Sequence, residues 1–367
     1  MGVATLLAVV VLGASPGVQA APGPIVTVVA SGLENPRGLK FGPDGRLYVA
    51  EGGLGRTQTT TPNDCEQVPV PVGPYSGGFT ARISRVDPWT GARSTVADHL
   101  PSSQTSPAEG SGVSGVADVA FIDDVLYAVE SGAGCSHGLK NTVNSILRID
   151  RNGRVTQVAD LSSFLKAHPV AHPNPEDFEP DGTWYSLVAV GDRLYAVEPN
   201  HGEIDVINPR TGAISRLVDV SATQGHIVPT SLVQYDGGFL LGNLGVFEPD
   251  SSVPVGVRRV SRRGDIDLVA AGLTAVVGVA VHHGRIYALE SFTGSFAPTP
   301  DVARSGTVVR LNERTGDWET VVTGLSFPTA MTFGEDGTLF ISNKGYIQPT
   351  NTAGEIVKVR LAWADED

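Results

Sequence analysis

One short pattern recurs six times along the chain: an apolar strand, a turn and a second apolar strand that ends in Glu or Asn. The first copy runs from Leu39 to Glu51 and the second from Val119 to Glu130. The terminal Glu or Asn positions of the six successive copies lie 79, 68, 45, 47 and 53 residues apart. Such periods are typical of a β-propeller with one blade per repeat, and the longer intervals indicate insertions. The six terminal residues are Glu51, Glu130, Glu198, Asn243, Glu290 and Asn343.

Each repeat is followed by a third strand, as at residues 83–87 and 146–150, and in the first five repeats by a fourth strand. The sixth fourth strand is missing at the C-terminal end, and residues 25–33 have its character. We therefore predict an all-β fold, a six-bladed β-propeller with four-stranded blades, closed by the N-terminal strand. Residues 21–367 form its single domain. Two stacked sandwiches, the alternative, explain neither the repeat nor the displaced strand.

The composition narrows the class of partner. The chain has 26 Lys and Arg against 39 Asp and Glu, a formal charge of −13, and no basic run. This charge argues against nucleic acid or an anionic membrane as the main partner.

The first 20 residues resemble a signal peptide. The apolar run 3–13 is too short to span a bilayer, and Val18-Gln19-Ala20 forms a small-residue cleavage pattern. We predict cleavage after Ala20, a secreted or extracytoplasmic protein, and no membrane span in the mature chain. A basic n-region is absent, and the alternative is a buried N-terminal strand or helix.

Three insertions stand out. Those at 52–79 and 131–143 follow the second strands of adjacent blades and carry Cys65 and Cys135. An exported chain permits a disulfide between them, and two free buried thiols are the alternative. The third, 161–184, carries His168 and His172, but its prolines forbid the helix that would align both imidazoles. This favours an extended surface loop over a metal site.

In a propeller, the first strand of each blade lines the axial channel. The loops that enter first strands and leave second strands share one face, here called the funnel face. Polar residues near the starts of first strands are therefore candidate site residues. Asp118 interrupts an apolar stretch, and His226 is of the type that carries protons at neutral pH. Candidate catalytic residues are Asp118, His226 and Asn35, and candidate ligand-binding residues are Arg37, Tyr185, Thr230 and Thr329.

The repeated acidic position has two interpretations. Carboxylate oxygens suit Ca²⁺, which takes six to eight oxygen ligands. In the second interpretation, which repetition in every blade favours, each carboxylate accepts backbone N–H groups of its own blade. The candidate metal ligands are Glu51, Glu130, Glu198 and Glu290.

The chain resembles the ScyD/ScyE-like family of exported propeller proteins, and the resemblance covers most of the mature chain. It implies export and a six-bladed fold, and it assigns no reaction. The matching stretches are 32–39, 174–182, 228–232, 272–280 and 286–290.

At longer range the pattern is similar to the SMP-30/gluconolactonase, paraoxonase, NHL and strictosidine-synthase-like propellers. The lactonases among them imply a divalent ion on the axis, held by Glu, Asn and Asp. Here the first strands offer Asn35 and Asp118, but then Ser186, Thr230 and Thr329. This departure weighs against lactonase activity. Similarity to quinoprotein sugar dehydrogenases rests on the segment 32–39 alone, without the expected His context.

We expect a monomeric binding or scaffold protein whose funnel face takes a small molecule or an exported protein partner, with Ca²⁺ as the one candidate cofactor. The alternative is a divalent-metal-dependent hydrolase of the lactonase or esterase type. A lectin-like or quinone-dependent role ranks third. The residues leave open whether the protein is an enzyme.

Overall fold

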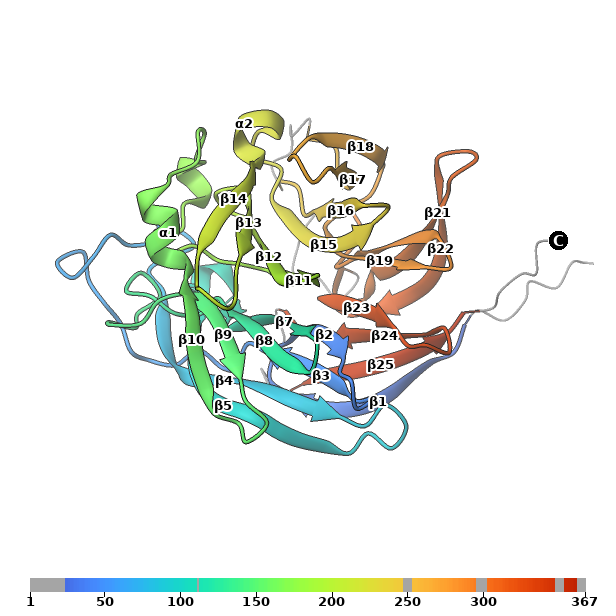
Figure 1. Ribbon diagram of the computed structural model, residues 1–367, viewed down its shortest axis with the longest axis horizontal. Coiled ribbons are helices and arrows are strands. Elements are labelled where there is room, and N and C mark those ends of the chain that lie inside the picture. The colour runs from blue at the N-terminus through green and yellow to red at the C-terminus, as the bar shows by residue number, and fades with distance from the viewer. Residues whose placement is uncertain (1–23, 111, 247–252, 295–301, 347–352, 362–367) are drawn as a thin grey trace, which may run out of the picture.

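The computed structural model describes residues 24–110, 112–246, 253–294, 302–346 and 353–361. Six β-sheets surround a central axis like the blades of a propeller (Figure 1). The proposed signal peptide, residues 1–20, lies outside the described residues. No helix in the described ranges is long and apolar enough to cross a bilayer.

The blades follow one another along the chain, and each blade's first strand lies nearest the axis. Blade 1 contains β2 (Pro36–Phe41), β3 (Leu47–Glu51), β4 (Ser76–Val86), β5 (Arg93–Gln104) and the short β6 (Val113–Ser114). Blade 2 contains β7 (Val116–Ile122), β8 (Val125–Glu130), β9 (Ser145–Ile149) and β10 (Val155–Asp160). Blade 3 contains β11 (Ser186–Val190), β12 (Arg193–Glu198), β13 (Glu203–Ile207) and β14 (Ile214–Asp219).

The second half of the ring repeats this order. Blade 4 contains β15 (Pro229–Tyr235), β16 (Gly238–Asn243), β17 (Gly256–Val260) and β18 (Ile266–Ala271). Blade 5 contains β19 (Val276–His282), β20 (Arg285–Glu290), β21 (Gly306–Asn312) and β22 (Asp317–Leu325). Blade 6 contains β23 (Ala330–Phe333), β24 (Thr338–Asn343), β25 (Gly354–Arg360) and β1 (Val26–Leu33).

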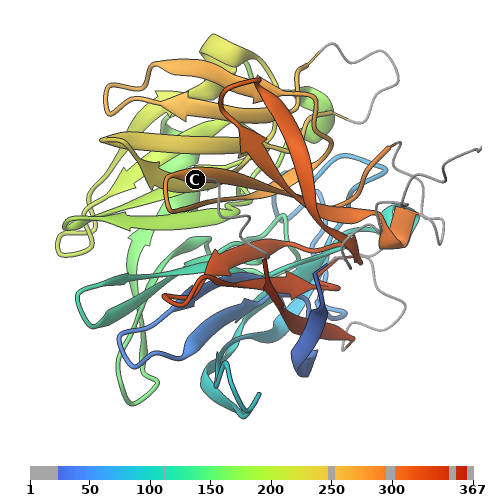
Figure 2. The ribbon, with the colours of Figure 1, turned by 90° about the vertical axis from the view of Figure 1, so that its right-hand side faces the viewer.

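The predicted ring closure is confirmed. β1 pairs antiparallel with β25, with Val28 opposite Val357, and so becomes the outer strand of blade 6. In Figure 2 the tight hairpin turns lie on one side of the ring, here called the turn face, and the longer connections lie on the other side, the funnel face.

The hydrophobic core is divided among the junctions between blades. Six apolar clusters each join two neighbouring blades, and together they cover all six junctions. At the closing junction, the ring of Phe41 in blade 1 meets that of Phe340 in blade 6 edge-on at 5.4 Å. Because each blade buries its faces against two neighbours, the ring is stable as a whole.

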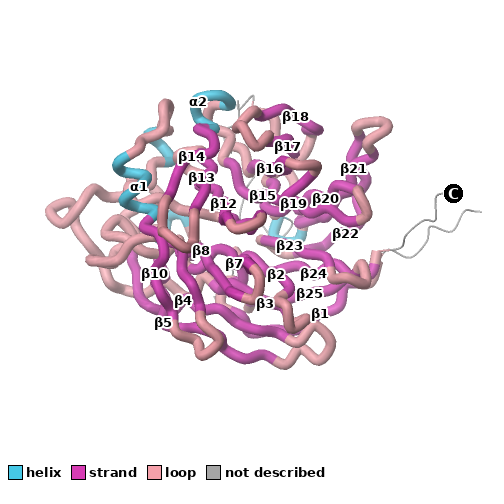
Figure 3. The backbone as a smooth tube through the Cα atoms, in the orientation of Figure 1, coloured by secondary structure: helices cyan, strands magenta, loops and turns pink. Residues whose placement is uncertain are grey.

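Figure 3 shows how little helix the described residues contain. α1 (Leu161–Ala167) and α2 (Val220–Gln224) each follow an Asp whose side chain accepts a first-turn N–H, from Ser163 at 2.8 Å and from Ala222 at 3.0 Å. Short 3₁₀ turns lie at Pro107–Glu109, Pro175–Asp177 and Val302–Arg304. The expectation of an extended loop at 161–184 is therefore wrong for its first seven residues, since the Asp160 cap permits a helix ahead of Pro169.

The predicted disulfide is also confirmed. Cys65 and Cys135 are bonded, with their Cα atoms 6.2 Å apart. The Thr60 hydroxyl donates to the Cys135 carbonyl at 2.6 Å, and Lys140 pairs with Asp64 at 2.7 Å. These bonds fix the insertion of blade 1 to that of blade 2.

Candidate functional site

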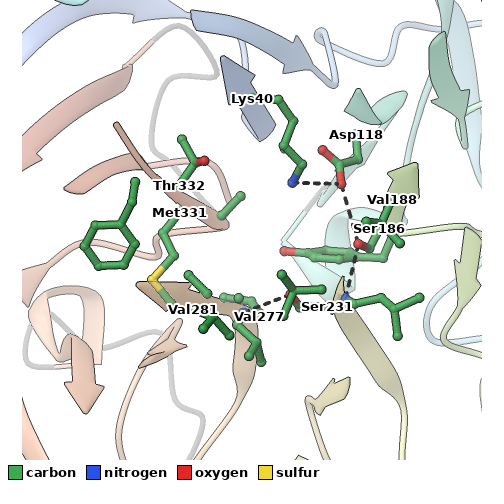
Figure 4. Close-up of a pocket in the computed structure, with 18 residues that line it drawn as sticks. Lys40, Asp118, Ser186, Val188, Ser231, Val277, Val281, Met331 and Thr332 are labelled. Carbon is green, nitrogen blue, oxygen red and sulfur yellow. Dashed lines mark hydrogen bonds and ion pairs between the residues drawn. The ribbon is translucent and has the colours of Figure 1, made fainter. Parts of the chain in front are cut away.

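A cavity of about 210 Å³ lies on the axis of the ring (Figure 4). First strands of all six blades contribute to its wall. Its polar side includes Lys40, Asp118, Ser186 and Ser231. Its apolar side includes Val277, Val281, Ala330, Met331 and Phe333.

One position of the first strand explains where the cavity has space and where it has charge. In each blade it lies opposite the residue that precedes the terminal Glu or Asn of the second strand. This position holds Gly38, Asp118, Ser186, Ser231, Gly278 and Ala330 in blades 1 to 6. Three of the six have at most a methyl group, which leaves room on the axis. Gly38 is required sterically, because a Cβ there would lie 1.9 Å from Asp118 Oδ1.

Asp118 is 3% exposed, and both of its carboxylate oxygens bond within the protein. Oδ1 accepts the N–H of Val119 at 2.8 Å, and Oδ2 accepts the N–H of Leu187 in blade 3 at 2.9 Å. Lys40 Nζ lies 3.6 Å from Oδ2. Burial raises the pKa of Asp118, and Lys40 and the two N–H groups oppose that rise.

Two serines repeat this contact between blades. Ser186 Oγ accepts the N–H of Leu232 at 3.3 Å, and Ser231 Oγ accepts the N–H of Val279 at 2.8 Å. A side chain of blades 2, 3 and 4 thus caps a backbone donor of the following blade. These bonds set the spacing of the first strands around the axis.

The funnel-face end of the channel is closed by protein contacts. Tyr185 donates its hydroxyl to the Thr329 carbonyl at 2.7 Å, across the channel from blade 3 to blade 6. Burial raises the pKa of Tyr185 to about 12, so the phenol stays protonated as the donor. Arg37 donates to the Val113 carbonyl and lies over the Tyr346 ring, 5.6 Å from its centroid. Three predicted ligand-binding residues, Arg37, Tyr185 and Thr329, therefore meet at one place.

Both ends of the cavity have partly exposed side chains. These are Lys40, Val188 and Val281 at the turn-face end, and Arg37 and Tyr185 at the funnel end, where Val276 and Thr329 are buried. The Lys40 side chain is 35% exposed. Solvent therefore reaches the Lys40 end of the cavity from the turn face.

Other predicted candidates bond to their own surroundings. Thr230 donates to the Val276 carbonyl at 2.7 Å and joins blades 4 and 5. Asn35, in the left-handed region at φ +52°, donates to the Gly53 carbonyl at 2.8 Å. His226 Nε2 lies 3.1 Å from Asp177 Oδ2. No hydrogen bond or ion pair joins any two of the described side chains of Asn35, Asp118 and His226.

The six repeated Glu/Asn residues hold the loops of their own blades. Glu51 Oε2 accepts the N–H of Glu34 at 2.6 Å, and Glu290 Oε1 accepts that of Thr274 at 2.6 Å. Burial raises the pKa of Glu130 to about 8 and that of Glu198 to about 7. The four glutamates lie in four different blades, and the described residues contain no group of three or more His, Cys, Asp or Glu that could hold a metal ion.

The donors on the axis do not suit calcium. Asp118 is the one carboxylate of the described cavity wall, its oxygens accept backbone N–H groups, and the Lys40 ammonium lies beside it. Ca²⁺ needs six to eight oxygen ligands and is repelled by an adjacent ammonium group. We therefore assign no step to a metal at this place.

A buried polar group lies outside the predicted set. Tyr75 donates to Glu179 Oε1, His137 Nε2 lies 3.6 Å from Glu179 Oε2, and His137 Nδ1 lies 2.7 Å from Ser103 Oγ. Burial raises the pKa of Glu179 well above its ordinary value and lowers that of His137 to about 4. The group joins the three insertions.

The sequence also missed Lys40 and Ser231. Both lie at alternate positions of strands at whose starts predicted candidates lie. Lys40 follows Gly38 by two residues in β2, and Ser231 follows Pro229 by two residues in β15. That alternation is the signal that could have found them.

No protein-family model and no curated protein sequence matches the chain. Several solved structures are similar to it in fold. A PQQ-bound aldose sugar dehydrogenase from Streptomyces coelicolor has a TM-score of 0.56 at 16% identity, over 94% of this chain and 100% of that one. A gluconolactonase from Xanthomonas campestris has a TM-score of 0.55 at 11% identity, over 92% and 90%. A putative glucose dehydrogenase from Thermus thermophilus has a TM-score of 0.54 at 17% identity, over 92% and 100%. At these identities the likeness establishes the fold alone, a six-bladed β-propeller.

Proposed function

We propose that the protein is a small-molecule-binding propeller that uses its axial cavity. The observation that carries this is the cavity itself, which is lined by first strands of all six blades and is polar on one side and apolar on the other. Protein ligand sites commonly combine apolar walls with a few convergent polar groups. The volume of about 210 Å³ restricts the occupant to a small molecule.

Two polar groups of the wall have donor capacity beyond their contacts within the protein. The Lys40 ammonium has three N–H donors and lies near one described acid, Asp118. Ser231 Oγ accepts a bond, and its own hydrogen has no acceptor among the described residues. Asp118 and Tyr185, by contrast, bond fully within the protein. Lys40 and Ser231 are therefore the side chains of the described wall that can donate to a ligand.

A metal-dependent hydrolase is the second candidate. The observation in its favour is Asp118, a carboxyl on the axis whose pKa is raised by burial. The adjacent Lys40 ammonium weighs against the metal that this chemistry requires.

The compartment, oligomeric state and family of the protein are further parts of this proposal. We propose that the chain is exported after cleavage at Ala20, acts as a monomer and belongs to the ScyD/ScyE-like propellers. The Cys65–Cys135 bond supports an oxidising compartment. A bound exported protein on the funnel face is the partner that we place second to a small molecule.

The test compares ligand binding before and after the cavity is filled. Ala330 lines the cavity, and Ala330→Met places a longer side chain in it. The control is Ala92→Met, at an exposed position in the β4–β5 turn. Thermal melting is recorded against a library of small polar molecules and aryl and lactone esters, each with EDTA or added Ca²⁺.

Compounds that raise the melting temperature of the parent and of Ala92→Met, but not that of Ala330→Met, support the proposal. Equal shifts in all three proteins contradict it. Lactone or ester turnover that EDTA abolishes favours the hydrolase instead.

A further inference from the structure

Among the described residues, the backbone N–H groups that face the axis have side-chain acceptors in blades 3, 4 and 5 but not in blades 6 and 1. In blades 3, 4 and 5 the N–H of Leu187, Leu232 and Val279 each donates to a side chain of the preceding blade. The equivalent residues in blades 6 and 1 are Met331 and Leu39. In the described part of the chain no side chain accepts either N–H group, because the preceding blades supply Gly278 and Ala330 at the capping position.

Sheet register shows that both N–H groups face the axis. In blade 1, Gly42 donates to the Arg46 carbonyl at 2.9 Å. Residues in an antiparallel ladder alternate between hydrogen-bonded and non-hydrogen-bonded pairs. Leu39 and Val49 therefore form a non-hydrogen-bonded pair, and the N–H of Leu39 points away from β3 towards the axis.

The same argument holds in blade 6. Gly334 donates to the Thr338 carbonyl at 2.8 Å, so Met331 and Ile341 form a non-hydrogen-bonded pair. The N–H of Met331 thus also faces the axis, and Met331 lines the cavity.

A cation lies beside these donors. Lys40 follows Leu39 directly, and its partly exposed side chain lines the cavity. Blades 6 and 1 are held side by side by two bonds, from Thr329 Oγ1 to the Pro36 carbonyl at 2.7 Å and from Ser342 Oγ to the Arg37 carbonyl at 2.6 Å. The first strands of blades 6 and 1 thus direct two backbone donors towards the axis, and the Lys40 ammonium lines the same cavity next to Asp118.

The neighbouring wall defines the rest of the occupant. Val277, Val281, Met331 and Phe333 form its apolar part. Asp118, the acid in the described wall, already accepts two N–H groups and pairs with Lys40, so its charge is compensated. An ammonium group can serve two carboxylates at once, because it has three donors.

We propose that the axial cavity binds a small carboxylate with a hydrocarbon body. The carboxylate accepts from Lys40 Nζ and from the N–H groups of Leu39 and Met331, and the hydrocarbon body packs on the valine, methionine and phenylalanine wall. Charge-assisted bonds of this kind are stronger than neutral ones and reject an uncharged analogue. This inference rests on the proposed function and names the ligand class of that same site.

The test uses four probes of one size: benzoate, benzamide, benzyl alcohol and benzylammonium. The last represents a cationic ligand, which backbone carbonyl groups on the same strands would attract. Titration calorimetry of the full mature protein at pH 7 should give a benzoate affinity at least 10-fold above the other three. Lys40→Met should abolish that preference. Lys358→Met, on the outer part of blade 6 over Trp89, should keep it.

A second variant separates loss of binding from a folding defect, because Lys40→Met leaves the buried Asp118 without its cation. Lys40→Met/Asp118→Asn removes both charges and should also bind benzoate and benzamide equally. Crystals soaked in 4-bromobenzoate should show bromine towards the apolar wall and the carboxylate at Leu39 and Met331.

Equal binding of benzoate and benzamide to the parent protein would overturn the carboxylate inference and leave the binding function standing. Tighter binding of benzylammonium would do the same. If none of the four probes binds and no library compound is sensitive to Ala330→Met, the proposed function fails, and this inference fails with it.

Discussion

Glu130 ends β8 and shows what burial does to a single carboxyl group. Its Oε1 accepts the N–H groups of Ser131 at 3.0 Å and Gly132 at 2.8 Å, whereas Oε2 is buried and lacks a partner among the described residues. Burial outweighs the two N–H bonds, and the pKa rises to about 8. In the folded protein the group is therefore protonated at neutral pH.

We predict that Glu130→Gln raises the free energy of unfolding by an amount that depends on pH. The folded pKa lies above the unfolded one, so stability from this group is fully present below about pH 4.5 and is lost as pH rises to about 8. The free energy of unfolding of the variant should rise relative to the parent over that range, by at most about 1.4 kcal/mol per pH unit. Denaturant titrations at pH 5, 6, 7 and 8 measure it, and a difference that does not vary with pH would contradict the assignment.

Residue chemistry explains why the sequence located only part of the site. Asp118 interrupts an apolar strand, so its place in the channel was predictable. Whether a polar side chain can bind a ligand depends on its hydrogen-bond partner within the protein. Thr230 and Asn35 bond to carbonyl groups that no sequence pattern identifies. Lys40 was missed because its role arises from a contact with the neighbouring blade.

At the scale of elements, the insertions of blades 1, 2 and 3 form one cross-linked layer on the funnel face. The disulfide joins the first two, and the buried group of Tyr75, His137 and Glu179 joins all three. A cavity of about 280 Å³ lies between the insertions of blades 1 and 3, lined by Cys65, Leu165, Pro169, Phe178 and His201 among others.

We predict that Cys65→Ser/Cys135→Ser lowers the free energy of unfolding. The bond closes a loop of 70 residues, which corresponds to about 4 kcal/mol in the chain-entropy model. Chemical denaturation measures the loss. Hydrogen exchange should quicken in residues 52–75 and 131–144 and stay unchanged in β19 and β20 of blade 5. Uniform quickening would show instead that the bond stabilises the whole ring.

Secondary structure was predictable where the repeat dictated it and not elsewhere. The strands of every blade and the displaced β1 follow from the pattern. β6 and the long extensions of β4 and β5 lie in blade 1 alone, so no repeat reports them. α1 depends on one capping bond from Asp160, which competes with the prolines that follow.

At the scale of the whole molecule, closure of the ring depends on β1. Without it, β25 would be an open edge, and Leu33 would leave the cluster that joins blades 6 and 1. We predict that deletion of residues 24–33 lowers the melting temperature and causes association on size-exclusion chromatography. A synthetic peptide of residues 24–35, added in trans, should restore both properties. A deletion variant that melts like the parent would show that five and three-quarter blades suffice.

The position of β1 also determines the order of events during synthesis. Residues 26–33 are made before the rest of the ring, yet their partners at 354–360 are made more than 300 residues later. Long-range pairing of this kind is slow, because the chain must be brought together end to end before the contact forms. While the ring is being made, β1 therefore remains unpaired, and the first strand of the ring to be made is the last to be placed.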